Sequence, residues 1–265
     1  MYAAGVDIGA ATAKAVILND DGILTSAVIP TGDSVAKAGE KVIGVALDQA
    51  RLTMNDLDFV VSTGYGRRAV PCAGKTVTEI ICHAAGASFL MPQARTIIDI
   101  GGQDSMVIGL DDNRSVANFV MNDKCAAGTG RFLEVMAGVL NVEIAEMGGI
   151  SLKGKEPCQV SSTCTVFAET EMISLRAEGV SKENLLAGIH RALAHRVVIM
   201  GAQVRFRKDI VFTGGVAKNM GIKKALEDEI GIEILVPEEP QIIGAFGAAI
   251  LAKKSSTKGA ITENS

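Results

Sequence analysis

The start of the chain consists of short apolar runs broken by glycines and a polar turn, a pattern that is typical of β-strands joined by tight turns. Glycines and the polar turn 20–22 separate three apolar runs, which lie at 2–9, 12–19 and 23–30. The next segment, 34–51, repeats its apolar residues at helical spacing, which is the signal of an amphipathic helix. The sequence therefore predicts three strands joined by tight turns and followed by a helix. A further strand at 57–64 and a helix at 76–91, which stops at Pro92, continue the pattern.

The same arrangement of strands and turns returns in the middle of the chain. Asp7 precedes its polar turn at Asp20 by 13 positions, and Asp99 precedes its polar turn at Asp111 by 12. This internal duplication predicts an α/β fold with two similar lobes and a cleft between them. The repeat is too long for a solenoid.

The second half of the chain reads as mostly helical, and this gives the expected domain organisation. Helices are predicted after 126, after 164, and over 182–204 and 220–231, with strands at 208–215 and 232–237. The first lobe is predicted to span 1–94, with the last helix, 240–254, returning to it, and the second lobe to span 95–239. The polar tail 255–265 is predicted to be disordered.

Three glycine-bearing turns have the composition of phosphate-binding turns. They are Asp7-Ile-Gly-Ala-Ala-Thr-Ala-Lys14, Asp99-Ile-Gly-Gly-Gln-Asp104 and Thr213-Gly-Gly-Val-Ala-Lys-Asn219. Backbone amides at such turns can hold phosphate oxygens, an aspartate at each strand end can orient Mg²⁺, and Lys14 supplies a positive charge. One such turn is more often a hairpin, but three in this order predict a nucleotide site. Neither a P-loop nor a dinucleotide-binding pattern is present.

Five cysteines occur, and they do not form a disulfide framework or a self-contained metal motif. They are Cys72, Cys82, Cys125, Cys158 and Cys164; the odd number and the absence of a Cys-x-x-Cys pair argue against both. Cys125 and Cys164 each precede a helical pattern, where the partial positive charge of a helix N-terminus favours a thiolate or an anionic cluster. From the residues alone, two buried structural cysteines remain an equal alternative. The three histidines fall within predicted helices, where packed or surface positions are expected: His83, His190 and His195.

Composition and charge exclude several classes of partner. The chain is 48% apolar and 21% charged, with a formal net charge of −4, so no basic surface indicates a nucleic acid or an anionic membrane as a partner. No apolar run is long enough to span a bilayer, and the first residues do not resemble a secretion signal. A cytoplasmic protein is expected.

The three glycine turns resemble the phosphate-1, phosphate-2 and adenosine motifs of the actin, Hsp70 and sugar-kinase superfamily. This resemblance implies two ribonuclease-H-like lobes that close on ATP and Mg²⁺, with the metal near Asp7 and Asp99. The nucleotide-binding residues that it implies are Asp7, Gly9, Ala10, Ala11, Thr12, Lys14, Gly101, Gly102, Gln103, Gly214, Gly215 and Lys218. Ala10 and Ala11 stand where hydroxyl residues are usual, so backbone amides or Thr12 take over the phosphate contacts. Gln103 or Asp104 positions the attacking water, or else both bond to the local turn.

Further segments resemble the ATPase activators of 2-hydroxyacyl-CoA dehydratases, which belong to the BadF/BadG/BcrA/BcrD-type ATPase family. The matching segments are "STGYGR", "DIGGQD", "NDKCAAGTGRFLEVMA", "SSTCTVFAE" and "FTGGVAKN", in the family's order and over nearly the whole chain. The resemblance implies that Cys125 and Cys164 bind one 4Fe–4S cluster shared across a homodimer, since a cubane cluster takes four thiolates. Cys82 and Cys158 are expected in the core, and Cys72 is left open.

The function that this resemblance implies is an ATPase coupled to low-potential electron transfer. Ferredoxin or flavodoxin would supply the electron, and a 2-hydroxyacyl-CoA dehydratase in an anaerobic host would receive it. Delivery to benzoyl-CoA reductase or to a corrinoid protein is one alternative. A small-molecule kinase, such as a sugar kinase, and a nucleotide-dependent sensor without an electron role are others. The cysteine pair argues against a kinase, which does not require it. Absence of visible absorbance after anaerobic purification would favour the sensor.

Overall fold

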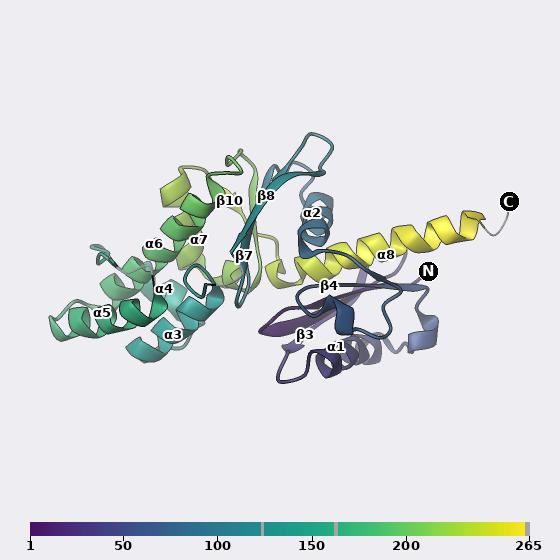
Figure 1. The fold of residues 1–265 in the computed structure, drawn as a ribbon, viewed down its shortest axis with the longest axis horizontal. Helices are drawn as coiled ribbons and strands as arrows, with labels where there is room; N and C mark the ends of the chain where they lie inside the picture. Colours follow the sequence, from purple (N-terminus) through teal and green to yellow (C-terminus); the bar gives the residue numbers. More distant parts are fainter. Residues whose placement is uncertain (123–124, 162–163, 263–265) are drawn as a thin grey trace. The chain divides into compact units, whose positions relative to one another are not determined.

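The structure is a computed structural model that describes residues 1–122, 125–161 and 164–262 (Figure 1). The chain divides into two compact units. Unit 1 consists of Met1–Ala94, Leu110–Val116 and the chain from Gln241 onward, and unit 2 consists of Arg95–Gly109 and Ala117–Pro240. Each unit contains one mixed five-stranded sheet with helices packed against it.

The sheet of unit 1 begins with the predicted succession of three strands. Its order is β3-β2-β1-β4-β5, and β1 pairs antiparallel with β2 and parallel with β4. The strands are β1 Ala3–Ile8, β2 Thr12–Leu18, β3 Ile23–Pro30, β4 Phe59–Thr63 and β5 Lys75–Thr76. The three strands predicted before residue 31 are therefore confirmed, and β4 corresponds to the strand predicted at 57–64.

Helices cover both faces of this sheet, which explains why every residue of β1 is buried. Val6 and Ile8 share one apolar cluster with residues of α1 (Val35–Ala50), and Ala3 shares another with residues of α8 (Ile243–Thr262). Successive side chains of a strand point to opposite faces, so β1 serves both layers. Gly5 lies against α8, where an added methyl would overlap the carbonyl oxygen of Ala245.

The helices predicted at 34–51 and 76–91 are confirmed, with one shifted boundary. Ser34 caps α1 by accepting a hydrogen bond from the amide of Lys37 at 3.4 Å, and the helix ends at Arg51, whose φ is 57°. Helix α2 runs over Glu79–Leu90 instead of from residue 76. Its start is later because Lys75 and Thr76 pair with β4. Helix α2 packs against α8 (Figure 1).

The sheet of unit 2 repeats the connectivity of the sheet of unit 1. Its order is β10-β9-β6-β7-β8, and β6 pairs antiparallel with β7 and parallel with β9. The strands are β6 Thr96–Ile100, β7 Ser105–Leu110, β8 Val116–Asn122, β9 Ile210–Thr213 and β10 Ile234–Leu235. Strand β6 thus corresponds to β1 and β9 to β4. The duplication predicted from the repeated aspartate turns is confirmed. The strand predicted at 232–237 is real but short.

In the described part of unit 2, five α-helices pack around one apolar cluster. They are α3 Gly130–Leu140, α4 Met147–Ser151, α5 Thr165–Ala177, α6 Lys182–Gly201 and α7 Met220–Ile230. Helix α3 starts later than predicted, because the hydroxyl of Thr129 donates to the carbonyl of Ala126 at 2.7 Å and closes a turn first. Short 3₁₀ turns in the chain are η1 Met54–Asp56, η2 Arg67–Ala69, η3 Gly215–Lys218 and η4 Pro240–Ile242.

The last helix extends further than the sequence predicts. A disordered tail is expected from Ser255, whereas α8 continues to Thr262. The hydroxyls of Ser255, Ser256 and Thr257 bond to carbonyls four positions earlier, at 2.7–3.2 Å, so these polar side chains are accommodated within the helix. Within the described part of the chain, no helix is long and apolar enough to cross a membrane.

Candidate functional site

Asp7 lies at the end of β1, and its carboxylate is almost entirely buried, with 6% of the residue exposed. Lys14 is directly opposite it on β2, and the Lys14 Nζ is 3.3 Å from Oδ2 of Asp7. Because both side chains are largely buried, the pair is screened only weakly by solvent. The structure therefore brings two residues of the predicted phosphate-1 turn into direct contact.

Two glycines from distant segments approach the carboxylate of Asp7. Gly64 follows β4 with a φ of +90°, and an added methyl there would overlap Asp7 Oδ1 and lie 2.5 Å from the carbonyl oxygen of Ile8. A methyl on Gly244 would lie 3.0 Å from Asp7 Oδ2 and 2.9 Å from Nε2 of His83. His83 is buried, and its ring and the Asp7 carboxylate both lie close to the Cα of Gly244. Sequence reasoning treated His83 only as packed or exposed, and it did not single out Gly244.

The turn between β1 and β2 is closed by its own backbone. The amide of Gly9 donates to the carbonyl of Thr12 at 3.0 Å, and the hydroxyl of Thr31 donates to the carbonyl of Gly9 at 2.8 Å. Ala10 and Ala11 are exposed at its tip. The side-chain amide of Gln241 donates to the Thr12 hydroxyl at 3.4 Å. The turn is therefore held from within, and its tip presents small residues.

Asp99 repeats the position of Asp7 in unit 2. It is 4% exposed at the end of β6 and pairs in register with Thr213 of β9, whose hydroxyl donates to Asp99 Oδ1 at 2.7 Å. Gly214 follows with a φ of +89°, and an added methyl would overlap the carbonyl oxygen of Ile100 and lie 3.0 Å from Asp99 Oδ1. The structure thus brings together the ends of the predicted phosphate-2 and adenosine segments.

The turn after Asp99 rests on the start of α3. The carbonyls of Gly101 and Gly102 accept hydrogen bonds from the amides of Gly130 and Arg131, both at 2.8 Å. The amide of Gly101 donates to the carbonyl of Asp104 at 2.9 Å, and a methyl on Gly101 would overlap the Asp104 carboxylate.

Gln103 is exposed at the tip of the same turn, and Asp104 is half-buried. Both residues are thus adjacent to the phosphate-2 glycines, as the sequence order requires.

The segment 213–219, which is predicted to bind adenosine and is called the adenosine segment below, is fixed at both of its ends. The amide of Gly214 donates to the carbonyl of Pro240 at 2.9 Å. Gly215 begins the 3₁₀ turn η3, and Asn219 then caps α7 by accepting from the amides of Gly221 and Ile222 at 3.0 and 3.2 Å. The ammonium of Lys218 is exposed and 4.0 Å from the Glu239 carboxylate, a weak surface pair. Lys218 is therefore available to other anions.

Cys164 is the N-cap residue of α5, as predicted, and it is an exposed free thiol. The segment before it is held by Glu171, whose carboxylate accepts from the Ser161 amide at 2.9 Å and from the Ser161 hydroxyl at 2.8 Å. Ser162 and Thr163, which separate Ser161 from Cys164 in the sequence, lie outside the described residues. Cys164 therefore faces solvent at a helix N-terminus, where backbone amides favour an anion.

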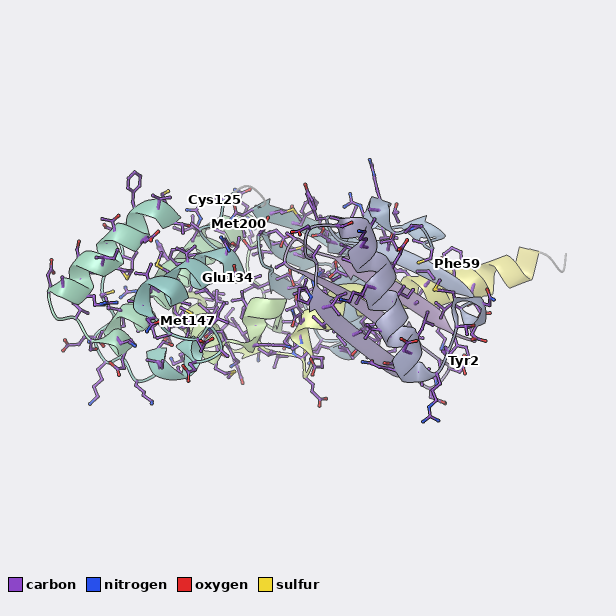
Figure 2. All side chains as sticks on the ribbon, turned by 90° about the horizontal axis from the view of Figure 1, so that it is seen from below. Tyr2, Phe59, Cys125, Glu134, Met147 and Met200 are labelled. Atoms are coloured by element: carbon purple, nitrogen blue, oxygen red, sulfur yellow. The ribbon has the colours of Figure 1, made fainter. Side chains whose placement is uncertain are left out.

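Cys125 lies in the turn before α3 and not at the helix start itself (Figure 2). The side-chain amide of Asn122 donates to the carbonyls of Cys125 and Ala127 at 3.2 and 3.1 Å. The guanidinium of Arg196 on α6 donates from Nη2 to the Cys125 Sγ at 3.3 Å. This contact could not be predicted from the sequence, because the two residues are 71 positions apart. The Cys125 sulfur therefore lies beside a positively charged side chain.

The other three cysteines are poor thiolate donors. Burial raises the pKa of Cys82 to about 12, and it raises the pKa values of Cys72 and Cys158 as well. Cys82 lies fully buried on α2, which confirms the expected core position. Cys158 packs so closely against Gly188 that a methyl there would overlap its sulfur.

The two duplicated sheets and their aspartate–glycine turns define the class of protein as an actin-like ATPase. The chain belongs to the BadF/BadG/BcrA/BcrD ATPase family, whose model matches residues 4–252.

Close relatives share this architecture over nearly their whole length. A 2-hydroxyisocaproyl-CoA dehydratase activator from Clostridioides difficile is 46% identical over 253 residues, which is 95% of each chain. The structure of component A of the Acidaminococcus fermentans (R)-2-hydroxyglutaryl-CoA dehydratase superposes with a TM-score of 0.93 at 42% identity, covering 97% of this chain and 99% of that one. The activator of the C. difficile 2-hydroxyisocaproyl-CoA dehydratase with bound ADPNP gives a TM-score of 0.94 at 43% identity, covering 99% and 98%.

More distant proteins bear on the alternatives. A benzoyl-CoA reductase polypeptide from Thauera aromatica is 33% identical over 259 residues, covering 93% of this chain and 91% of that one. A ROK family glucokinase from Streptomyces griseus is 13% identical with a TM-score of 0.61, covering 96% of this chain and 100% of that one. The glucokinase therefore shares the fold alone.

Proposed function

We propose that the protein is an ATP-dependent electron-transfer activator of a 2-hydroxyacyl-CoA dehydratase. In this proposal two copies share one 4Fe–4S cluster through Cys125 and Cys164 of each, and a ferredoxin or flavodoxin supplies the electron. The single observation that carries the proposal is the contact between the Gly101–Gly102 carbonyls and the first amides of α3. It joins a predicted phosphate turn directly to the segment that follows Cys125. The names of the relatives support the dehydratase as the partner.

The cysteine residues fit a shared cluster. Cys164 is an exposed thiol at the N-cap of α5, and Cys125 lies in the turn before α3 with a guanidinium beside its sulfur. A cubane cluster takes four thiolates, and one chain supplies two. Among the described residues, no group of three or more His, Cys, Asp and Glu side chains could hold a metal ion. In this proposal the remaining ligands come from a second copy, which a two-fold axis would provide.

The surface beside Cys164 also fits a second copy. Val166 and Phe167 follow Cys164 on α5 and are 67% and 68% exposed. Large apolar side chains that adjoin each other on the surface mark interaction sites more often than single exposed ones do. Covering them would also remove water from the neighbourhood of the thiols.

The aspartates and glycine turns fit ATP with Mg²⁺. Asp7 and Asp99 would orient the metal through water, and the turn amides and Lys14 would hold phosphate oxygens. Hydrolysis forms a bond between a water oxygen and the γ-phosphorus and breaks the bond to the bridging oxygen of ADP. In this proposal Gln103 or Asp104 orients that water, and the Asp104 carboxylate can take its proton.

Nucleotide state would reach the cysteines through the backbone. A shift of the Gly101–Gly102 turn on phosphate loss would move the amides of Gly130 and Arg131, and with them the start of α3. When bound, the cluster supplies one-electron transfer at low potential, and the amides and solvent around its thiolates tune that potential. The chain's own part is to hold these thiolates and to change their surroundings.

Fewer observations support the alternative functions. Delivery to benzoyl-CoA reductase or a corrinoid protein would use the same residues, and the identity to the reductase polypeptide is lower than to the dehydratase activators. A kinase would share the nucleotide turns, but it would leave the exposed Cys164 and the Arg196–Cys125 contact without a role. No observation favours a sensor without redox chemistry.

The decisive experiment is anaerobic purification and reconstitution with iron and sulfide, followed by iron and sulfide analysis and EPR. We expect about four irons per dimer in the wild type and loss of the cluster in Cys125→Ala and Cys164→Ala. Cys72→Ala, a half-buried cysteine of unit 1, is the matched control and should keep the cluster. Wild-type protein without iron would end the electron-transfer proposal. Full cluster content in Cys125→Ala would remove this residue from the ligand set.

A further inference from the structure

Helix α6 contacts both the adenosine segment and the Cys125 sulfur. His190 lies on α6 and contacts Asn219, which ends the adenosine segment, and Arg196 lies on α6 and contacts Cys125. The two residues are six positions apart, which corresponds to about 9 Å along a helix axis. One short stretch of a continuous helix therefore links two sites that the sequence places far apart.

The contact of α6 with the adenosine segment is a closed hydrogen-bond network. The Ser151 hydroxyl donates to the carbonyl of Gly148 at 2.8 Å, so its oxygen is left to accept from Nδ1–H of His190, also at 2.8 Å. The other ring nitrogen, Nε2, then accepts from the Asn219 side-chain amide at 3.3 Å. This assigns a neutral ring with the proton on Nδ1. Burial, which lowers the pKa of His190 to about 4, keeps it neutral at physiological pH.

Ser151 and His190 pack tightly against the first turn of α7. A methyl on Gly221, in the first turn of α7, would overlap the Ser151 hydroxyl and lie 2.5 Å from Nδ1 of His190. Asn219 uses its oxygen to cap α7 and its amide nitrogen to bond His190. The end of the adenosine segment cannot shift relative to α6 without stretching the half-buried hydrogen bond between Asn219 and His190, which would leave Nε2 of the buried ring without its donor.

The contact of α6 with Cys125 is equally direct. Arg196 is half-buried, its Nη2 is 3.3 Å from the Cys125 sulfur, and its Cδ would be 3.2 Å from a methyl on Gly128. Gly128 has a φ of +92°, a conformation that favours glycine. Its backbone lies against the aliphatic part of the Arg196 side chain. A cavity of about 560 Å³ adjoins this contact and is lined by Asn122, Gly128, Phe132, Arg196 and Met200, among others. The guanidinium therefore has space into which it can be displaced.

We propose that α6 transmits occupancy of the adenosine segment to Cys125, and that Arg196 is the positioning residue at its end. The inference rests on the proposed function, because it assigns Cys125 to the cluster. It adds a second route to the one through the Gly101–Gly102 turn. Since adenosine is common to ATP and ADP, the α6 route reports whether any nucleotide is bound. The phosphate turn alone distinguishes ATP from ADP.

The test compares iron release to a chelator from reconstituted protein without nucleotide, with ADP and with ADPNP. In the wild type we expect the release rate to change on ADP binding and again between ADP and ADPNP. In Arg196→Leu the ratio of the rates with and without ADP should fall to one, while the difference between ADP and ADPNP remains. Arg196→Lys, which keeps the charge, should retain part of the ADP response. Arg191→Leu, on an exposed residue of the same helix, is the matched control and should behave as the wild type.

The outcomes separate the two proposals. A wild type that holds no iron overturns the proposed function and this inference together. Two outcomes overturn the α6 route alone when the wild type holds a cluster. One is that Arg196→Leu keeps the wild-type change of iron release on ADP binding. The other is that ADP does not change iron release in the wild type. Hydrogen exchange of the amides at 125–129, which leaves out the Gly130 amide bonded to Gly101, provides a readout that needs no cluster. ADP should change their exchange in the wild type and in Arg191→Leu, but not in His190→Gln with ADP bound at saturation. An unchanged ADP effect in His190→Gln would also overturn the route.

Discussion

Gly64 and Gly214 occupy equivalent places in the two units, with φ values of +90° and +89°. Each follows a threonine that pairs with the aspartate of the neighbouring strand: Thr63 with Asp7, and Thr213 with Asp99. At each position a side chain would overlap atoms of the adjoining strand end. The duplication thus extends to the backbone conformation beside each carboxylate.

Replacing Gly64 by alanine is expected to disable ATP turnover. The positive φ costs about 1–2 kcal/mol for a residue with a Cβ, and the methyl would also displace the Asp7 carboxylate. Gly179→Ala is the matched control, because Gly179 has the same φ of +90° and open space around it. ATP hydrolysis and urea denaturation should show that both variants lose stability and that only Gly64→Ala loses activity. Equal activity in both would mean that the approach to Asp7 is unimportant.

Asp7→Asn and Asp99→Asn should reduce Mg²⁺-dependent ATP turnover by at least about a hundredfold. Each change removes the negative charge that would orient the metal and keeps the size of the side chain. The EPR signal of the reconstituted cluster should persist, since neither residue belongs to the cysteine segments. Phosphate release measures the first effect, and wild-type turnover in either variant would show that the metal site lies elsewhere.

His190 should make the protein less stable in mild acid. Its pKa is lowered from 6.5 to about 4 in the folded protein, so the unfolded chain binds the extra proton between these values. Stability is therefore complete above pH 6.5 and falls as the pH drops toward 4, with a loss of about 2 kcal/mol between pH 7 and pH 5. Urea denaturation should show a shallower pH dependence in His190→Gln. An equal slope in the wild type and in His190→Gln would contradict the prediction.

The thiols should differ widely in reactivity in metal-free protein. Cys164 is exposed, whereas Cys82 is fully buried with a pKa of about 12, which leaves roughly one thiolate in ten thousand at pH 8. Alkylation by iodoacetamide, followed by peptide mass spectrometry, should modify Cys164 at least about a hundred times faster than Cys82. Comparable rates in native protein would mean that α2 does not protect Cys82 in solution.

Two glycine-to-alanine changes should shift stability in opposite directions. Gly247 faces the carbonyl oxygen of Cys82, which a methyl would overlap, so Gly247→Ala should destabilise unit 1 by about 1–3 kcal/mol. Gly44 lies inside α1 with open space around it, so Gly44→Ala should stabilise by about 0.5–1 kcal/mol. Thermal and urea denaturation measure both, and a neutral Gly247→Ala would show that α8 can move away from α2.

The sequence was informative where a structural feature is local. Strands β1 to β3 follow from the alternation of apolar runs and turns, and α1 follows from its periodicity and its Ser34 cap. Helix α2 starts later than its pattern indicates because Lys75 and Thr76 join the sheet, and a pairing with another strand leaves little trace in the segment itself. The Ser255–Thr257 hydroxyls bond within α8, so a polar composition did not imply a disordered tail there.

The candidate site was predictable in its motifs and not in its contacts. The aspartates, the glycines and the two cysteines were found because each motif is contiguous. The approach of His83 and Gly244 to Asp7 and the bond between Arg196 and Cys125 join segments far apart in the chain. Such contacts depend on how helices pack, which a single sequence does not encode at a fixed spacing.

The pairing of Lys14 with Asp7 at 3.3 Å has a consequence for the form in which nucleotide can enter. Each buried charge already has its counter-ion, and a polyphosphate that captures the ammonium leaves the carboxylate uncompensated, at a cost of several kcal/mol for a dry site. A divalent cation that arrives with the polyphosphate takes the place of the ammonium beside the Asp7 carboxylate. The Lys14–Asp7 pair is then replaced by two pairs, one between Lys14 and phosphate and one between the cation and Asp7. Metal-free ATP should therefore bind more weakly than its magnesium complex. Lys14→Met should keep that preference, because the Asp7 carboxylate then has no counter-ion until a divalent cation arrives.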